Sequence, residues 1–208
     1  MVAGLHSVMM LILLCLTLLE SFTTGQPVDL PCQWNSLAGA TFDLRPLTVV
    51  SSEAMSYHIR DGDIPCTKET EPTYSFIWNF CHKVTNASIP HHICRDGQQG
   101  AALQYLNRSS DGYHECHVIG RYDANNDDNE FSLLESHNPA MGVSMKYPLG
   151  EKCPGNILRS ATIDVKCDNV EKVIESALEP TKCQYRMQMR SYYGCPTECP
   201  VTSQGLCR

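Results

Sequence analysis

Residues 158–167 of this chain read Leu-Arg-Ser-Ala-Thr-Ile-Asp-Val-Lys-Cys, and this stretch decides the class of fold. Apolar side chains stand at Ala161, Ile163 and Val165, with polar side chains between them. Successive side chains of a β-strand point to opposite faces, so a period of two predicts a strand with one buried face.

The same period of two recurs along the chain. Aromatic side chains alternate with smaller ones in Thr73–Cys81, which predicts a half-buried strand, and Cys183–Arg190 alternates in the same way. Further short strands are expected in three ranges: Ala101–Leu106, His114–Arg121 and Gly142–Tyr147. Many short strands separated by turns favour an all-β barrel or sandwich.

One segment departs from this pattern. In Asp168–Leu178, Asp168 could cap a helix, Glu171 stands three residues later, and Pro180 would stop it. This arrangement is typical of a helix start and end, and it predicts a short helix of one or two turns.

Arg159 falls on the apolar face if the strand extends back that far. A buried guanidinium needs a partner or a ligand, because stripping it of water is costly. Tyr185 has interior parity in its own strand, and Glu179 precedes it by six residues, so the three side chains could meet at one end of a barrel. The alternative is that the strand starts at Ser160 and leaves Arg159 in an exposed loop. Parity alone does not decide between them.

Length and charge restrict the functional classes. With 208 residues the chain is too short for a large multidomain enzyme but long enough to bury one core. Its 23 acidic residues outnumber the 16 Lys and Arg, which disfavours binding to nucleic acid.

The N-terminal segment is interpreted as an address. Residues 8–19 are continuously apolar but too few to span a bilayer, and polar residues follow them, so residues 1–25 are predicted to be a secretory signal peptide. No later stretch is long and apolar enough to span a membrane. The sequons at Asn86 and Asn107 predict N-glycosylation, and the 12 cysteines are then expected to form disulfides.

The order of motifs in the second half resembles mannose 6-phosphate receptor homology domains. The resemblance rests on these stretches: Tyr147–Cys153, Leu158–Asp168, Glu179–Tyr185 and Gly194–Cys195, with Cys32, Thr41–Leu47 and Tyr74–Cys81 similar to the family's opening strands. The resemblance implies a flattened β-barrel or sandwich of two antiparallel sheets, stapled by disulfides, with a mannose pocket at one end. We expect this domain to span residues 26–195.

The resemblance also implies four sugar-binding residues, which match Gln104, Arg159, Glu179 and Tyr185. Arg159 and Gln104 would read the axial 2-hydroxyl of mannose through directed hydrogen bonds. Glu179 would accept from sugar hydroxyls and neutralise Arg159 when the pocket is empty. Gln98 and Gln99 are alternatives to Gln104.

In the second half, family spacing implies the disulfides Cys153–Cys183 and Cys167–Cys195. In the first half we expect Cys32–Cys81 and Cys94–Cys116. The pairing of Cys66, Cys199 and Cys207 stays open. Residues 196–208 look like the start of an epidermal-growth-factor-like module, so the chain could be a shortened form of a longer, membrane-anchored receptor.

The sequence favours no cofactor and no metal. The acidic stretch 123–130 resembles the start of a calcium loop, but Asp128 stands where the glycine should be and Leu134 where the closing glutamate should be. The scattered histidines are typical of surface residues. The loop before Cys153 holds Glu151, which would repel a phosphate, although Lys152 could contact one. We therefore expect unphosphorylated mannose to be favoured over mannose 6-phosphate.

Three functions remain after this reading. The first is a non-enzymatic lectin, lumenal, endolysosomal or secreted, that binds mannose-containing N-glycans on glycoproteins such as lysosomal enzymes for sorting or quality control. The second is a sugar-independent sorting or structural module of a truncated receptor. The third is a secreted hydrolase with paired carboxylates, which sequence spacing alone does not test.

Overall fold

Strands dominate the computed structural model, which describes residues 32–60, 74–94, 100–108, 113–123 and 130–199. The described residues lie within one compact unit, Pro31–Arg208. The predicted signal peptide lies outside the described residues, as does all of the predicted C-terminal module beyond Cys199.

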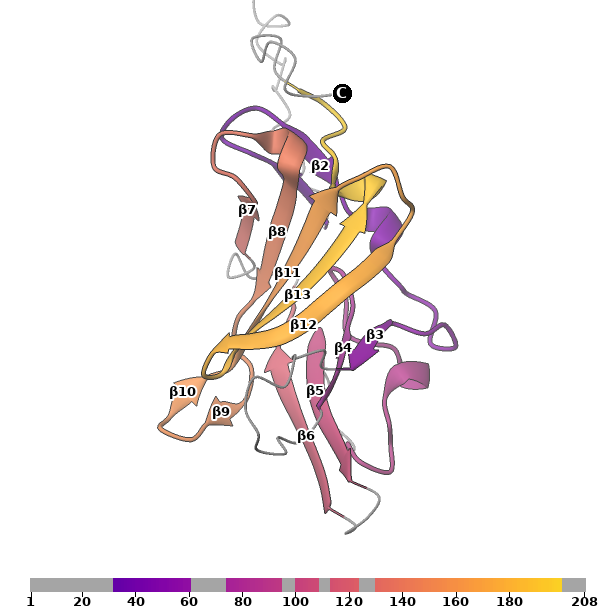
Figure 1. Ribbon diagram of the computed structural model, residues 1–208. Helices are drawn as coiled ribbons and strands as arrows, with labels where there is room; N and C mark the ends of the chain where they lie inside the picture. The colour runs from indigo at the N-terminus through magenta and orange to yellow at the C-terminus, as the bar shows by residue number, and fades with distance from the viewer. Residues whose placement is uncertain (1–31, 61–73, 95–99, 109–112, 124–129, 200–208) are drawn as a thin grey trace, which may run out of the picture. The chain divides into compact units, whose positions relative to one another are not determined.

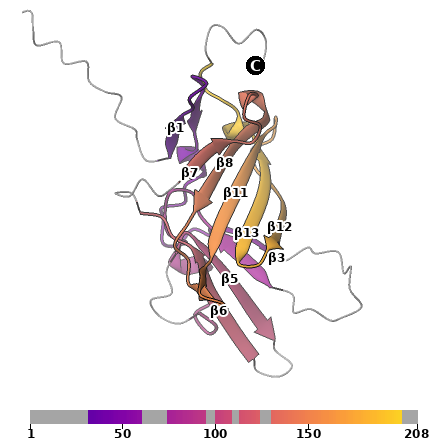
Figure 2. The ribbon, with the colours of Figure 1, turned by 90° about the vertical axis from the view of Figure 1, so that its left-hand side faces the viewer.

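Two larger sheets carry the fold (Figures 1 and 2). One has four antiparallel strands in the order β3 (Tyr57–Arg60), β4 (Ser75–Trp78), β5 (Ala102–Arg108) and β6 (Tyr113–Gly120). The other has five strands in the order β12 (Val173–Thr181), β13 (Gln184–Ser191), β11 (Ser160–Cys167), β8 (Gly142–Tyr147) and β7 (Glu130–Leu133). The all-β class with two sheets is therefore confirmed, and a strand lies in every range that the alternation predicted.

Smaller elements complete the described chain. Two hairpins pair β1 (Gln33–Asn35) with β2 (Thr41–Asp43) and β9 (Lys152–Cys153) with β10 (Ile157–Leu158). Four single turns of 3-10 helix are η1 (Arg45–Leu47), η2 (Asn86–Ser88), η3 (Pro139–Met141) and η4 (Tyr192–Gly194). Among the described residues, no helix has the length and apolar character that crossing a membrane requires.

The expectation of purely antiparallel sheets needs one correction. After β11 the chain runs to the sheet edge as β12 and returns as β13 between β12 and β11. Because β13 is antiparallel to β12, it runs parallel to β11, with Ala161 opposite Tyr185. This register brings the start of β11 beside the start of β13.

The predicted helix over Asp168–Leu178 is wrong. Residues from Val173 on form β12, because Val173 and Ile174 pair with β13 at the sheet edge. Asp168 caps no helix, and its Oδ2 atom accepts a 2.5 Å hydrogen bond from Arg190 instead. Tertiary pairing overrides the local helix signal here.

The core lies between the two sheets. Alternate residues of β11 and β13 enter it, with Phe76 and Trp78 of β4 from the other side. The β4 strand is buried on both faces rather than on one, because a second apolar cluster with Leu103 and Val118 covers its outer residue Ile77. Sheet contacts join β12 to β3 and β11 to β6, so the two inner faces hold the core as a sandwich.

Candidate carbohydrate-binding site

Arg159 lies at the end of the sandwich where β11 begins. The strand starts at Ser160, yet Arg159 is only 7% exposed, so neither sequence interpretation was complete. The loop before β9 fixes its backbone: Arg159 N donates to Glu151 O at 3.0 Å, and Gly150 N donates to Arg159 O at 2.9 Å. A Cβ atom on Gly150 would lie 2.7 Å from that same oxygen, so only glycine allows this close approach.

The Arg159 side chain contacts two of the other predicted residues. Its Nη1 atom donates to Gln104 Oε1 at 3.5 Å and forms a short hydrogen bond with the Tyr185 hydroxyl. The guanidinium carbon also lies 5.8 Å from the centre of the Tyr185 ring, within the range of a cation–π contact. The structure therefore brings Gln104, Arg159 and Tyr185 together from three strand regions far apart in the sequence.

Not every hydrogen-bond donor of this cluster has an acceptor among the described residues. Arg159 Nε is buried and has no hydrogen-bond partner among the described residues. No carboxylate of the described chain lies within ion-pair distance of the guanidinium. A buried cation with spare donors is expensive unless another group completes its contacts, which marks this end of the sandwich as a candidate ligand site.

Register and packing hold Gln104 and Tyr185 in place. Gln104 is buried in β5, opposite Phe76 of β4 and His117 of β6. The Phe76 ring packs against the Tyr185 ring with centres 6.0 Å apart. Gln98 and Gln99, the alternatives to Gln104, lie outside the described residues.

Glu179 reaches the cluster through a bulge. The register of β12 against β13 shifts between Leu178 and Thr181, and such irregularities redirect side chains. Glu179 Oε1 accepts from Cys183 N at 2.5 Å. Within the described residues this carboxylate accepts from the backbone of the β12–β13 turn and forms no ion pair with Arg159, so its neutralisation of Arg159 stays a prediction.

The Tyr185 hydroxyl stands between charges of both signs. Burial is the main cause that raises its pKa, Arg159 opposes that rise, and Glu179 adds to it. The hydroxyl consequently keeps its proton far into the alkaline range and can both donate and accept hydrogen bonds.

Sequence reasoning missed an acidic edge beside Gln104. On β6, Glu115 and His117 point to the same side as Gln104, since Gln104 and His117 are a direct cross-strand pair. His117 Nδ1 lies 3.3 Å from Glu151 Oε2, and its Nε2 contacts Glu115 Oε1 at short range. Tyr74 donates to Glu115 Oε2 at 3.3 Å. The shared parity of Glu115 and His117 was the available signal.

The disulfides tie the strands of this site together. The structure contains Cys32–Cys81, Cys94–Cys116, Cys153–Cys183 and Cys167–Cys195, the four expected pairs. Cys199 is disulfide-bonded as well. Cys153–Cys183 connects the β9–β10 hairpin to the turn between β12 and β13, where Cys183 N donates to Glu179 of β12, and both lie at the same end of the sheet (Figure 1). Of the described side chains, no group of three or more His, Cys, Asp or Glu could hold a metal ion.

Comparison with solved structures gives several mannose 6-phosphate receptor homology domains. Domain 11 of chicken IGF2R is 17% identical with a TM-score of 0.47, over 81% of this chain and 94% of that one. The MRH domain of glucosidase II beta bound to mannose is 26% identical with a TM-score of 0.27, over 45% and 83%. The MRH domain of Yos9 complexed with alpha3,alpha6-Man5 is 18% identical with a TM-score of 0.36, over 58% and 71%.

Sequence comparison gives a more direct assignment. No curated protein sequence matches the chain significantly. Residues 98–204, however, match the family described as glucosidase II beta subunit-like protein. This match spans just over half of the chain, and the protein therefore belongs to the glucosidase II beta subunit-like family of mannose 6-phosphate receptor homology domains.

Proposed function

We propose that this chain is a lectin module that binds terminal mannose of N-glycans on other glycoproteins. The family is one of carbohydrate-binding domains and not of enzymes. The observation that carries the proposal is the buried Arg159 guanidinium, which contacts Gln104 and Tyr185 while its Nε atom stays unpaired among the described residues. Mannose hydroxyls would complete these contacts.

The chemistry of the cluster suits a neutral hexose. A guanidinium offers several donors in one plane, and the Gln104 amide offers both donors and an acceptor, so adjacent hydroxyls can be read as a pair. The axial 2-hydroxyl of mannose differs in direction from that of glucose, which gives such a site a basis for selection. Glu179 and the protonated Tyr185 hydroxyl supply further acceptors and a donor.

The acidic edge supports unphosphorylated mannose as the preferred sugar. Glu115 and Glu151 lie on the two segments that flank Gln104 and Arg159. At physiological ionic strength, charges interact over about 8 Å, so a phosphate with roughly two negative charges would be repelled at this edge. Lys152, beside Glu151, is the cation that opposes this effect, and it is exposed.

The binding strength of one site should be modest. A single hexose offers few atoms, and its hydroxyls are well solvated in water, so we expect a Kd of about micromolar to millimolar. Multivalent display of the lectin or of its glycoprotein partner would then provide functional affinity. Lysosomal enzymes and folding glycoproteins are partners of suitable chemistry, with sorting or quality control as the role.

The location that fits this function is the lumen of the secretory or endolysosomal pathway, or the cell exterior. Four disulfides among the described residues are typical of chains that fold in an oxidising compartment. The predicted signal peptide over residues 1–25 accords with this location.

A glycan array with the mature chain displayed multivalently tests the proposal. The decisive variant is Arg159→Ala, and the matched control is Arg186→Ala, an arginine on the outer face of the same sheet. Signal on mannose-terminated glycans that disappears only in Arg159→Ala would support the lectin. Silence from a folded, disulfide-bonded wild type would instead favour the sugar-independent sorting module.

A further inference from the structure

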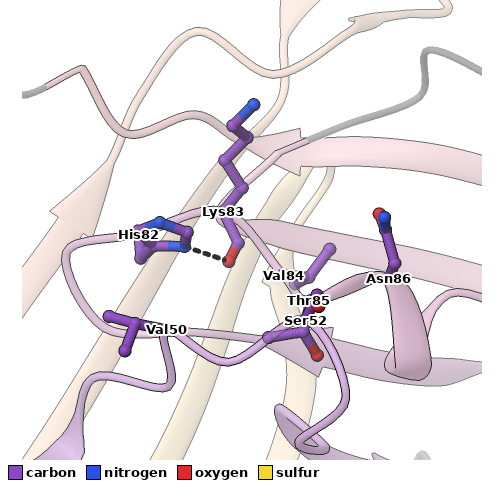
Figure 3. Close-up of a pocket in the computed structure, with 7 residues that line it drawn as sticks. All are labelled: Val50, Ser52, His82, Lys83, Val84, Thr85 and Asn86. Atoms are coloured by element: carbon purple, nitrogen blue, oxygen red, sulfur yellow. Dashed lines mark hydrogen bonds between the residues drawn. The ribbon is translucent and has the colours of Figure 1, made fainter.

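The described chain has a pocket that contains none of the residues of the Arg159 cluster (Figure 3). It is a shallow pocket between the loop that follows η1 and the segment that follows β4. Its lining residues are Val50, Ser52, His82, Lys83, Val84, Thr85 and Asn86. Asn86 stands at one end of the group and Val50 and His82 at the other (Figure 3).

The walls of this pocket are fixed by hydrogen bonds. The His82 ring is held to Lys83 O at 3.0 Å, and Val84 N donates to Gly100 O at 2.9 Å. Ala87 N donates to Ser52 O at 3.1 Å, which ties the two sides together. The pocket is therefore a built feature of the fold rather than a gap between loose loops.

Val50 is an anomaly within it. Its side chain is 72% exposed although it is large and apolar, whereas Val84 beside it is buried. Isolated apolar side chains are common on protein surfaces, but here Val50 joins Val84 and the His82 ring in one concave lining. A ligand with an apolar face and polar edges would fit these residues.

Asn86 begins the sequon Asn86-Ala-Ser88 and is itself exposed. Ser88, by contrast, is only 7% exposed. Its hydroxyl accepts from Ser56 N at 2.5 Å and shares a 2.9 Å hydrogen bond with Thr85 Oγ1, which also donates to Ala54 O at 2.6 Å. A glycosyl transferase that must read both the asparagine amide and the serine hydroxyl of a sequon cannot reach this hydroxyl in the folded chain.

We propose that Asn86 carries an N-glycan, attached before the Ser56–Thr85–Ser88 network closes, and that the first N-acetylglucosamine of this glycan occupies the pocket. The donor is a lipid-linked oligosaccharyl pyrophosphate. Asn86 Nδ2 bonds to the anomeric carbon, the bond from that carbon to the pyrophosphate oxygen breaks with its electron pair leaving on that oxygen, and the amide proton passes to a base of the transferase.

The proposed occupant matches the lining. The C–H face and the acetyl methyl group of N-acetylglucosamine would cover the exposed Val50, and its hydroxyls would meet Ser52 and Lys83. Because the sugar is bonded to Asn86 itself, its effective concentration at the pocket is high, and weak contacts suffice to hold it there.

Thermal unfolding of the secreted chain tests the occupant, with the second sequon removed by Asn107→Gln. Peptide mass spectrometry should show Asn86 occupied. Trimming the glycan to one N-acetylglucosamine should leave the Tm unchanged, while complete enzymatic removal should lower it by about 2 to 4 °C. Enzymatic removal of the whole glycan converts Asn86 to aspartate. The Tm of the deglycosylated chain is therefore compared with the Tm of the Asn86→Asp variant.

The control for the pocket is Val50→Ser, which keeps the sequon and removes the apolar wall. In that variant the Tm difference between the trimmed and the deglycosylated chain should vanish. An unmodified Asn86, an unchanged Tm on complete removal, or a difference that survives in Val50→Ser would each overturn the proposal.

The order of attachment has its own measurement. Microsomal membranes that contain the transferase and its lipid-linked donor should modify the reduced, unfolded chain and leave the folded, unglycosylated chain unmodified. Equal modification of both would overturn the claim that attachment precedes folding.

Discussion

The two faces of the five-stranded sheet each hold a buried charged side chain, but only the one on the outer face has a partner of opposite charge among the described residues. On the outer face Asp164 is almost completely buried, but it accepts from Ser144 Oγ at 2.9 Å and from Arg186 Nε at 2.5 Å, with Gln188 nearby at 3.4 Å. At the site end of the inner face, Arg159 contacts only neutral partners among the described residues. The satisfied network stabilises the sheet, whereas the incomplete one is suited to a ligand.

The largest expected effect comes from the disulfides at the two ends of this sheet. Replacing Cys153 and Cys183 by serine should cost about 3 to 4 kcal/mol of unfolding free energy, and the same change at Cys167 and Cys195 should cost about as much, because the loops are of similar length. Urea denaturation measures both losses.

Measuring the sugar affinity of the same two variants separates the role of each disulfide in the site from its role in stability. Only the loss of Cys153–Cys183 should weaken mannose binding, since this disulfide anchors the turn whose Cys183 N donates to Glu179. Equal loss of affinity in both variants would mean that the site depends on global stability instead.

Asp164→Ala is the next largest change. It removes the centre of the satisfied network, leaves Ser144 without its buried acceptor, and should lower the unfolding free energy by about 2 to 3 kcal/mol. Mannose affinity should stay within about twofold of wild type by titration calorimetry. A large loss of affinity with little loss of stability would reverse the roles assigned to the two faces.

Arg159→Met should do the opposite. The methionine fills similar volume without a buried charge, so stability should stay the same or rise by about 1 kcal/mol. Affinity for methyl α-mannoside should fall about 10- to 100-fold, equal to about 1.4 to 2.8 kcal/mol. Arg186→Met is the matched control and should bind as the wild type does. An Arg159→Met variant that loses stability and yet, once stabilised, still binds methyl α-mannoside would contradict this account.

The smallest effect concerns acid. Arg190 lowers the pKa of Asp168, and Lys166, followed by Arg190, lowers that of Glu175, so these outer-face carboxylates bind protons less readily when folded. Their stabilising contribution is present above the ordinary carboxylate pKa and is lost as the pH falls from there through the lowered pKa of the folded state. Urea midpoints from pH 6 to pH 3 should therefore fall less steeply in Arg190→Ala than in the wild type. Parallel slopes would show that these pairs contribute nothing.

Local patterns predicted much of this molecule. The alternation in β11 and β13 placed Ala161 and Tyr185 on the inner face, and parity raised the burial of Arg159 as one of two alternatives. The family resemblance, not local pattern, supplied the four site positions, which stay predictions, and the expected cysteine pairs were found. The strand alternation depends on residues close in sequence, so a single chain is enough to show it.

Features that depend on partners far apart in the sequence could not be predicted from local patterns. The parallel pairing of β11 with β13 depends on where β12 crosses the sheet, and the bulge that turns Glu179 toward Cys183 N depends on register. The helix predicted from Asp168 had a typical capping residue, yet the Asp168 carboxylate accepts a hydrogen bond from Arg190 instead. Likewise, Glu115 and Glu151 meet through His117 only because β6 lies beside the loop before β9.

The measurement that tests the central claim most directly is the NMR signal of the Arg159 guanidinium during titration with methyl α-mannoside, assigned by its absence in Arg159→Lys. A site completed by mannose predicts a saturable shift of this signal, with methyl α-glucoside causing little change and the Arg186 guanidinium none. An Arg159 signal that does not move with mannose, in a folded sample, would contradict the account.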